Sequence, residues 1–210
     1  MMSATEIAKE SLQAWLLRGT FVWRLPSAAG CALTFDDGPH EKYTPAILDL
    51  LRHHHVKATF FVVGDAVMRS PELLLRIASE GHAIGSHTFS HREITNLNAV
   101  ELEEDLARTR KVISELTGIN TNLVRPPRGR VDIPSLLRMR RLKYTLIHWS
   151  RTYSDYLHDG TAPLVERIRS RGLDSGDIAL FHDDNLYTLE ALEVMLPQWC
   201  SRGLKFTVIG

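Results

Sequence analysis

Two adjacent carboxylates and two histidines spaced four residues apart are the groups in this sequence best suited to hold a metal ion. Asp36 and Asp37 follow a run of β-forming residues, and His87 and His91 follow another such run. One carboxylate and two neutral imidazoles leave coordination positions open for water and substrate, as hydrolytic zinc sites require. The second carboxylate is then free to act as a base beside the metal. We therefore expect Asp37, His87 and His91 to be metal ligands, and Asp36 to be the base.

Each pair also has a plainer interpretation. Asp-Gly-Pro at residues 37–39 marks a turn by itself, and a chain with ten histidines places two of them four apart by chance. The spacing of His87 and His91 puts both imidazoles on one side of a helical turn. Because both pairs follow predicted strands, we favour the metal site over these alternatives.

Other predicted strands also end in polar groups. His182 follows an apolar run and is expected to act as an acid that faces the metal across the substrate. Arginines occur between residues 125 and 130, and polar groups occur between residues 149 and 156. The histidines at 53–55 are expected to end a helix and face solvent. No partner is predicted for the remaining histidines, which are His40, His82, His148 and His158.

The positioning elements alternate between strand and helix along the chain. Strands are predicted at residues 31–35, 58–63, 82–85, 123–125, 144–149, 177–181 and 205–209, and helices at 44–54, 71–80, 98–117, 134–140, 163–171 and 188–202. Such alternation indicates an α/β fold with parallel strands, either an open sheet or a barrel. Seven units in so short a chain favour a compact, incomplete barrel with its site at the carboxyl ends of the strands.

Composition excludes several classes of protein. The 210 residues are 44% hydrophobic and carry 25 basic and 25 acidic side chains, so no overall charge attracts nucleic acid. Cys31 and Cys200 are too few for a disulfide framework. No run reaches the roughly 18 apolar residues of a membrane span, and no signal peptide is recognised, so we expect a cytoplasmic protein. A helix at residues 5–18 is expected to pack on the domain, with peripheral membrane contact as the alternative.

Taken in order, the motifs resemble those of a known family. They are the segment 34–39, His87-x-x-x-His91, Arg125-x-Pro127, the pair Asp155-Tyr156, and Leu180-x-His182. From about Cys31 to its end, the chain resembles the polysaccharide deacetylases of carbohydrate esterase family 4, which share the NodB homology domain. The resemblance implies a distorted (β/α) barrel over residues 31–210, which the seven predicted units make an incomplete (β/α)7 barrel. The resemblance does not cover residues 1–30, which are expected to form an N-terminal helix and extension packed on the barrel.

The resemblance also implies an activity and the residues that perform it. The activity is removal of an acetyl group from an N-acetylated sugar by metal-activated water, with Zn²⁺, Co²⁺ or Ni²⁺ held by the predicted ligands. Arg125 pairs with the base Asp36, and Asp155 orients the acid His182. The metal and a backbone N–H near residue 128 stabilise the developing oxyanion. The residues implied to contact the substrate are Arg128, Leu180, Tyr156 and Pro127.

Three departures from the family pattern concern the substrate. Arg128 stands where the family usually has an aromatic residue, Tyr156 replaces a tryptophan, and Thr152 replaces a second aspartate. Arg128 and Arg130 would meet an anionic group of the substrate, such as a phosphate or carboxylate, or would be solvated surface residues.

Alternatives to sugar N-deacetylation remain at this point. They are deacylation of an O-acetyl ester, a formamide or a non-sugar amide, and a non-catalytic carbohydrate-binding protein that retains the fold. The expected partner is an acetylated carbohydrate, which is a polysaccharide, an oligosaccharide or a carrier-linked biosynthetic intermediate inside the cell. The oligomeric state and the identity of the sugar are not predicted.

Overall fold

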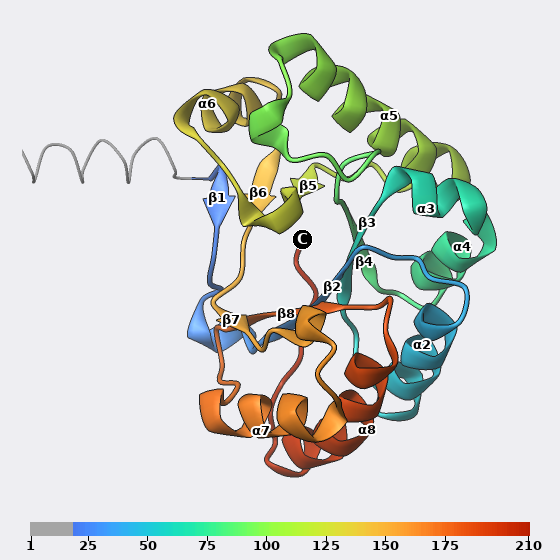
Figure 1. The fold of residues 1–210 in the computed structure, drawn as a ribbon, viewed down its shortest axis with the longest axis vertical. Coiled ribbons are helices and arrows are strands. Elements are labelled where there is room, and N and C mark those ends of the chain that lie inside the picture. Colours follow the sequence, from blue (N-terminus) through green and yellow to red (C-terminus); the bar gives the residue numbers. More distant parts are fainter. Residues whose placement is uncertain (1–18) are drawn as a thin grey trace, which may run out of the picture.

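The computed structural model describes residues 19–210 and shows eight parallel strands curled into an incomplete barrel (Figure 1). The strands are β1 (Phe21–Val22), β2 (Ala32–Asp36), β3 (Thr59–Val62), β4 (Ala83–Ser86), β5 (Leu123–Val124), β6 (Thr145–Ile147), β7 (Arg151–Thr152) and β8 (Ile178–His182). Their order in the sheet is β1-β6-β5-β4-β3-β2-β8-β7. The curve is open between the edge strands β1 and β7.

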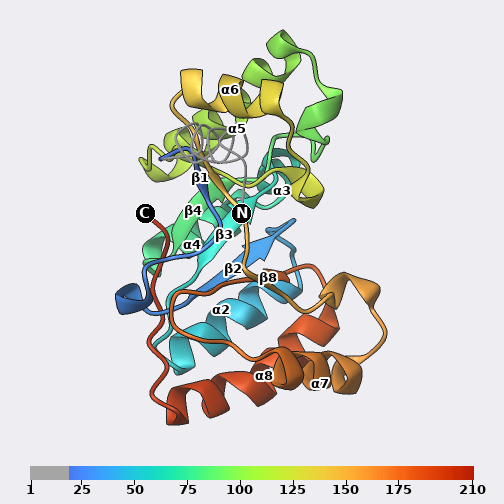
Figure 2. The ribbon, with the colours of Figure 1, turned by 90° about the vertical axis from the view of Figure 1, so that its left-hand side faces the viewer.

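Helices cover the outside of the curved sheet. They are α2 (Tyr43–His53), α3 (Gly64–Arg69), α4 (Pro71–Ser79), α5 (Ala99–Thr117), α6 (Ile133–Arg141), α7 (Thr161–Arg171) and α8 (Leu186–Ser201). Short 3-10 turns are η1 (Ser27–Ala29), η2 (Ile94–Asn96), η3 (Pro127–Gly129) and η4 (Asp155–Leu157). In Figure 2, α2, α7 and α8 lie below the strands, and α5 and α6 lie above them. Among the described residues, no helix has the length and apolarity of a membrane span.

The expected α/β fold with an incomplete parallel barrel is confirmed, with two differences. The sheet has eight strands rather than seven, because the two-residue strands β1 and β7 are too short to leave a sequence pattern. The prediction of a strand at residues 205–209 is wrong. There, Phe206 forms only an isolated bridge with Cys31, and the apolar Ile209 is buried in the barrel interior against residues such as Phe61 and Ile147. The predicted helix at residues 5–18 lies outside the described residues.

Strand β2 shows how the alternation of side chains along a strand places polar groups inside the barrel. Leu33 and Phe35 belong to the core between the sheet and the outer helices. Ala32 belongs to the inner cluster, so Thr34 and Asp36 also point toward the barrel interior. All five residues of the strand are buried. The polar inward residues therefore need partners inside the barrel.

Helix α5 begins at the predicted position and has a capping box at its start. The Asn98 side chain accepts hydrogen bonds from the backbone N–H groups of Val100 (2.9 Å) and Glu101 (3.1 Å), and the Glu101 carboxylate accepts from the Asn98 N–H (2.8 Å). We expect Asn98→Ala to lower the free energy of unfolding by about 1 kcal/mol, because N–H donors of the first turn lose their acceptor. Urea denaturation measures this change, and an unchanged midpoint would contradict it.

Candidate active site

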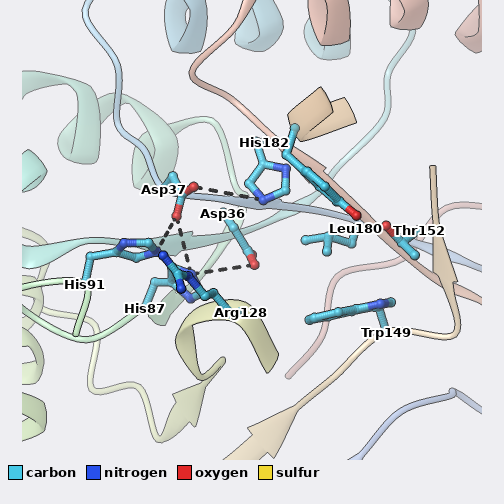
Figure 3. Close-up of a pocket in the computed structure, with 10 residues that line it drawn as sticks. Asp36, Asp37, His87, His91, Arg128, Trp149, Thr152, Leu180 and His182 are labelled. Carbon is cyan, nitrogen blue, oxygen red and sulfur yellow. Dashed lines mark ion pairs between the residues drawn. The ribbon is translucent and has the colours of Figure 1, made fainter. Parts of the chain in front are cut away.

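Four of the predicted site residues lie where parallel strands end. Asp36 and His182 are the last residues of β2 and β8, and these two residues are paired in register. His87 follows β4 directly, and Arg125 follows β5. Because all these strands are parallel, their carboxyl ends meet at one rim, and the side chains converge on one pocket (Figure 3).

The three predicted metal ligands are brought together. Ligand atoms of Asp37, His87 and His91 all lie within 4.8 Å of one another. Oδ1 of Asp37 is 3.4 Å from Nε2 of His87 and 3.0 Å from Nε2 of His91 (Figure 3). This oxygen is buried and has no hydrogen bond of good geometry within residues 19–210. An unpaired buried carboxylate oxygen that faces two imidazole nitrogens fits the donor set of a divalent metal.

Protonation states also favour a ligand role for Asp37. Burial by itself would raise the pKa of the Asp37 carboxyl, but the adjacent side chains of His87 and His91, together with the charge of His182, bring it below its usual value. The carboxyl is therefore ionised at neutral pH. An ionised carboxylate is the form that binds metal.

His87 is hydrogen-bonded on both sides, to the end of β3 and to the residue that follows β5. Its backbone N–H donates to the carbonyl of Val62 (2.8 Å), and its ring Nδ1 lies 2.8 Å from the carbonyl oxygen of Arg125. Since a carbonyl oxygen only accepts, Nδ1 carries the hydrogen in this bond. Nε2 of the neutral ring then presents its lone pair toward Asp37.

The interpretation of His87 and His91 as neighbours on a helical turn is wrong. The segment between them is a loop in which Thr88 and His91 have positive φ angles of 66° and 54°. The fixed end of β4 and this loop geometry, rather than a helical period, bring the two imidazoles to Asp37. The His91 side chain is 41% exposed, in contrast to the buried His87.

Asp36 is paired with a completely buried arginine. Nη1 of Arg125 donates to Oδ1 of Asp36 (2.8 Å) and to Oγ1 of Thr34 (2.6 Å). The remaining guanidinium nitrogens donate to the carbonyls of Ile147 (3.2 Å) and His148 (3.0 Å). Oδ2 of Asp36 is left on the side of the metal triad, 3.9 Å from Nε2 of His87. This arrangement aims one carboxylate oxygen at the pocket and anchors the other in the barrel.

His182 lies beside the triad, with its ring Nε2 3.9 Å from Oδ2 of Asp37 (Figure 3). Its ring Nδ1 is 3.0 Å from Oδ1 of Asp155, and its backbone N–H donates to Oδ2 of the same carboxylate (2.7 Å). Thr188 donates a further hydrogen bond to Asp155 (2.8 Å). Burial alone would lower the pKa of His182, but Asp155, together with Asp36 and Asp37, raises it to about 10. The imidazole is thus protonated at neutral pH and is able to donate a proton from Nε2.

These groups line one cavity of about 450 Å³, and its wall includes Trp149, which no motif indicated, and Thr152, which was noted only as a departure from the family pattern. Trp149 and Thr152 lie along it, after β6 and within β7 (Figure 3). Their position at the strand ends is the signal by which they could have been found. Pro127, which was expected to contact the substrate, is buried and does not line the cavity. The lining residues are Asp36, Asp37, His87, His91, Arg128, Trp149, Thr152, Tyr156, Leu180 and His182.

Comparison with known proteins gives a family for this arrangement. The sequence model described as "Polysaccharide deacetylase" matches residues 26–147. The peptidoglycan-N-acetylmuramic acid deacetylase PdaA of Bacillus subtilis is 39% identical over 181 residues, which cover 84% of this chain and 68% of PdaA. The chain belongs to the polysaccharide deacetylase family.

Further relatives and solved structures of this polysaccharide deacetylase family resemble the chain. The peptidoglycan-N-acetylglucosamine deacetylase PgdA of Listeria monocytogenes is 34% identical over 178 residues, and the matched region spans 85% of this chain but only 37% of PgdA. A solved peptidoglycan N-acetylglucosamine deacetylase has a TM-score of 0.87 at 30% identity, covering 94% of both chains. A family 4 pseudoenzyme from Bacillus anthracis has a TM-score of 0.83 at 25% identity, covering 91% of this chain and 68% of the other.

Among the departures from the family pattern, the arginines at the mouth of the pocket have an unexpected partner. Nη1 of Arg128 is 2.8 Å from one oxygen of Glu93, and Nη1 of Arg130 is 3.2 Å from the other. Both arginine side chains are more than half exposed, whereas that of Glu93 is 12% exposed. One carboxylate therefore holds both guanidinium groups at the rim and offsets one of their two charges. Glu93 is not part of any of the motifs, so no sequence pattern indicated its contact with the two arginines.

Proposed function

We propose that this protein is a metal-dependent hydrolase that removes the acetyl group from an N-acetylated amino sugar of a peptidoglycan-type glycan. The observation that carries the proposal is the convergence of a metal-ligand triad, the carboxylate of Asp36 and the protonated imidazole of His182 on one cavity. The names of the relatives, which act on N-acetylglucosamine or N-acetylmuramic acid, support the substrate class.

Asp37, His87 and His91 would hold the metal. Two imidazoles and one carboxylate suit Zn²⁺, with Co²⁺ and Ni²⁺ as alternatives. Lewis-acid activation of water and polarisation of the amide carbonyl are the chemistry that such a metal supplies when bound. Oδ2 of Asp36 faces this position and accepts the proton of the attacking water, while Arg125 keeps the carboxylate in place.

His182 would complete the reaction as the acid. Hydrolysis of an amide requires protonation of the leaving nitrogen, and Nε2 of His182 points into the pocket with a proton to give. Asp155 accepts the hydrogen bond from Nδ1, which fixes the ring and stabilises its charge. The carbon–nitrogen bond then breaks to give acetate and the free amine.

The remaining lining residues would position the sugar. Leu180 is buried in the wall and offers an apolar surface for the acetyl methyl group, and Tyr156 is exposed at the rim, where a sugar ring can pack on it. Arg128 would meet an anionic substituent of the sugar. Pro127 would act indirectly, because it is buried in the turn η3 that presents Arg128.

The proposal is tested by measuring acetate release. We expect release from N-acetylglucosamine oligomers or from peptidoglycan glycan strands, its loss after treatment with a chelator, and its return with added Zn²⁺. Acetylated xylan and N-formylated sugars are assayed in parallel. Release of acetate from the xylan, or of formate from the N-formylated sugars, without release from the N-acetylated glycans would replace the proposed N-deacetylation by ester or formamide hydrolysis.

A second candidate function is carbohydrate binding without turnover. The family 4 pseudoenzyme among the structural neighbours and the altered rim residues Arg128, Thr152 and Tyr156 favour it. The ordered pairs Asp36–Arg125 and Asp155–His182 speak against it, because binding alone does not need a buried base and an oriented acid. Bound metal with no acetate release from any acylated sugar would establish the binding function.

A further inference from the structure

The two histidine ligands are held in unequal ways. His87 is buried and bonded to two neighbouring strands, as described above. His91 lies at the end of a loop, has a positive φ of 54°, and has Asp37 as the one ion-pair or hydrogen-bond partner of its ring within the described residues. Non-glycine residues in the left-handed region persist only where the surroundings hold them. The position of His91 therefore depends on what holds the loop.

The backbone of the loop is bonded on two sides. At the start of α3, the N–H groups of Gly64 and Asp65 donate to the carbonyls of Thr88 (3.1 Å) and Phe89 (2.9 Å). On the other side, one carboxylate accepts three hydrogen bonds. Oδ1 of Asp105, on α5, accepts from the N–H of Phe89 (2.5 Å), and Oδ2 accepts from the N–H (3.4 Å) and hydroxyl (2.7 Å) of Ser90.

The side chain of Phe89 anchors the middle of the same loop. It is 2% exposed, and its ring lies so close to Gly64 that a Cβ atom there would be 2.3 Å from it. The guanidinium of Arg108 is 3.5 Å from the ring centroid. Asp105 and Arg108 are three residues apart on α5, so one face of this helix contacts the loop at two points.

We propose that Asp105 is a positioning residue that holds His91 in place for metal binding and so sets the metal affinity of the site. The inference rests on the proposed function, because it takes the triad as a metal site. Asp105 does not line the cavity, and it acts through the backbone of the two residues that precede His91. Without its carboxylate, two N–H groups lose their acceptor, and the loop is free to leave the left-handed conformation that aims His91 at Asp37.

The test measures metal binding directly. We expect Asp105→Asn, which puts an amide N–H₂ group in place of one accepting oxygen, to weaken Zn²⁺ binding by about tenfold or more in a chelator competition assay. The Co²⁺ absorption spectrum should lose intensity as one imidazole ligand is lost. At saturating Zn²⁺, acetate release should recover with an unchanged KM, because Asp105 does not line the substrate pocket.

Two further variants separate positioning from general stability. Asn98→Ala removes the cap of the same helix without touching the loop, so it should lower the melting temperature and leave the Zn²⁺ affinity unchanged. Gly64→Ala displaces the Phe89 ring from the opposite side and should weaken Zn²⁺ binding as Asp105→Asn does. It also provides the test if Asp105→Asn does not fold.

The inference is overturned if the wild type binds Zn²⁺ and Asp105→Asn binds it equally well. It is also overturned if Asn98→Ala weakens binding as much as Asp105→Asn, since helix stability would then explain the loss. A wild type that binds no Zn²⁺, Co²⁺ or Ni²⁺ overturns the proposed function itself, and the role of Asp105 with it.

Discussion

Asp36→Asn is expected to reduce acetate release by about 10³-fold or more while leaving the metal content of the protein unchanged. Removal of a general base costs roughly 10² to 10⁴ in rate, and an amide oxygen cannot take up the proton of the attacking water. The variant should keep its fold, because the side-chain oxygen of asparagine still accepts the hydrogen bond from Arg125 that Oδ1 of Asp36 accepts at 2.8 Å. Steady-state rates and metal analysis on the same preparation measure both effects.

Asp37→Asn provides the matched control for this prediction. Asp37 is the neighbouring carboxylate, and its Oδ1 faces both imidazoles of the triad. Its replacement should lower the metal content as well as the rate, whereas Asp36→Asn should lower the rate alone. Persistent turnover in the Asp36→Asn variant would remove Asp36 from the role of base.

Arg125→Lys is expected to lower the free energy of unfolding by at least about 3 kcal/mol. A buried acceptor that loses its donor costs roughly 1–3 kcal/mol, and removal of a partner from a buried ion pair costs about 3–5 kcal/mol. The planar guanidinium donates hydrogen bonds to Asp36, Thr34 and the carbonyls of Ile147 and His148 at once. A single ammonium group cannot reach all four acceptors. Urea denaturation of the two proteins measures the difference.

Arg128→Lys is the control for the loss of stability. Its guanidinium is 69% exposed and pairs with Glu93 at the rim, so the change should alter stability by less than about 0.5 kcal/mol. Arg125→Lys should also lower kcat, because Asp36 loses the bond that aims its free oxygen. Equal stabilities of Arg125→Lys and the wild type would show that the buried arginine network does not hold the barrel interior together.

Local patterns in the sequence predicted the residues that the structure brings together. The apolar strand ahead of Asp36 and the one ahead of His87 indicated a parallel sheet, and the carboxyl ends of parallel strands meet at one rim. The helix that begins at Asn98 was predicted for a similar reason, since the capping box at its start depends on residues within one helical turn. Such features form from neighbours in the chain, so the chain order of residue types is enough to indicate them.

Features that depend on distant contacts were not predictable in this way. The segment at residues 205–209 reads as a strand, yet its apolar Ile209 fills the barrel interior. Glu93 pairs with Arg128 and Arg130 from 35 and 37 residues away, and no local pattern marks that contact.

The same distinction between local patterns and distant contacts applies to the candidate site. The sequence by itself determined the chemical groups of the site and their attachment to strand ends, because residue type and strand pattern are local properties. Only the tertiary structure decided that Arg125 also bonds to Thr34, across 91 residues of chain, and that Asp105 bonds to the loop carrying His91. Closure of the barrel and packing of α5 against the loop bring these groups within hydrogen-bonding distance, and neither is encoded in the residues beside them.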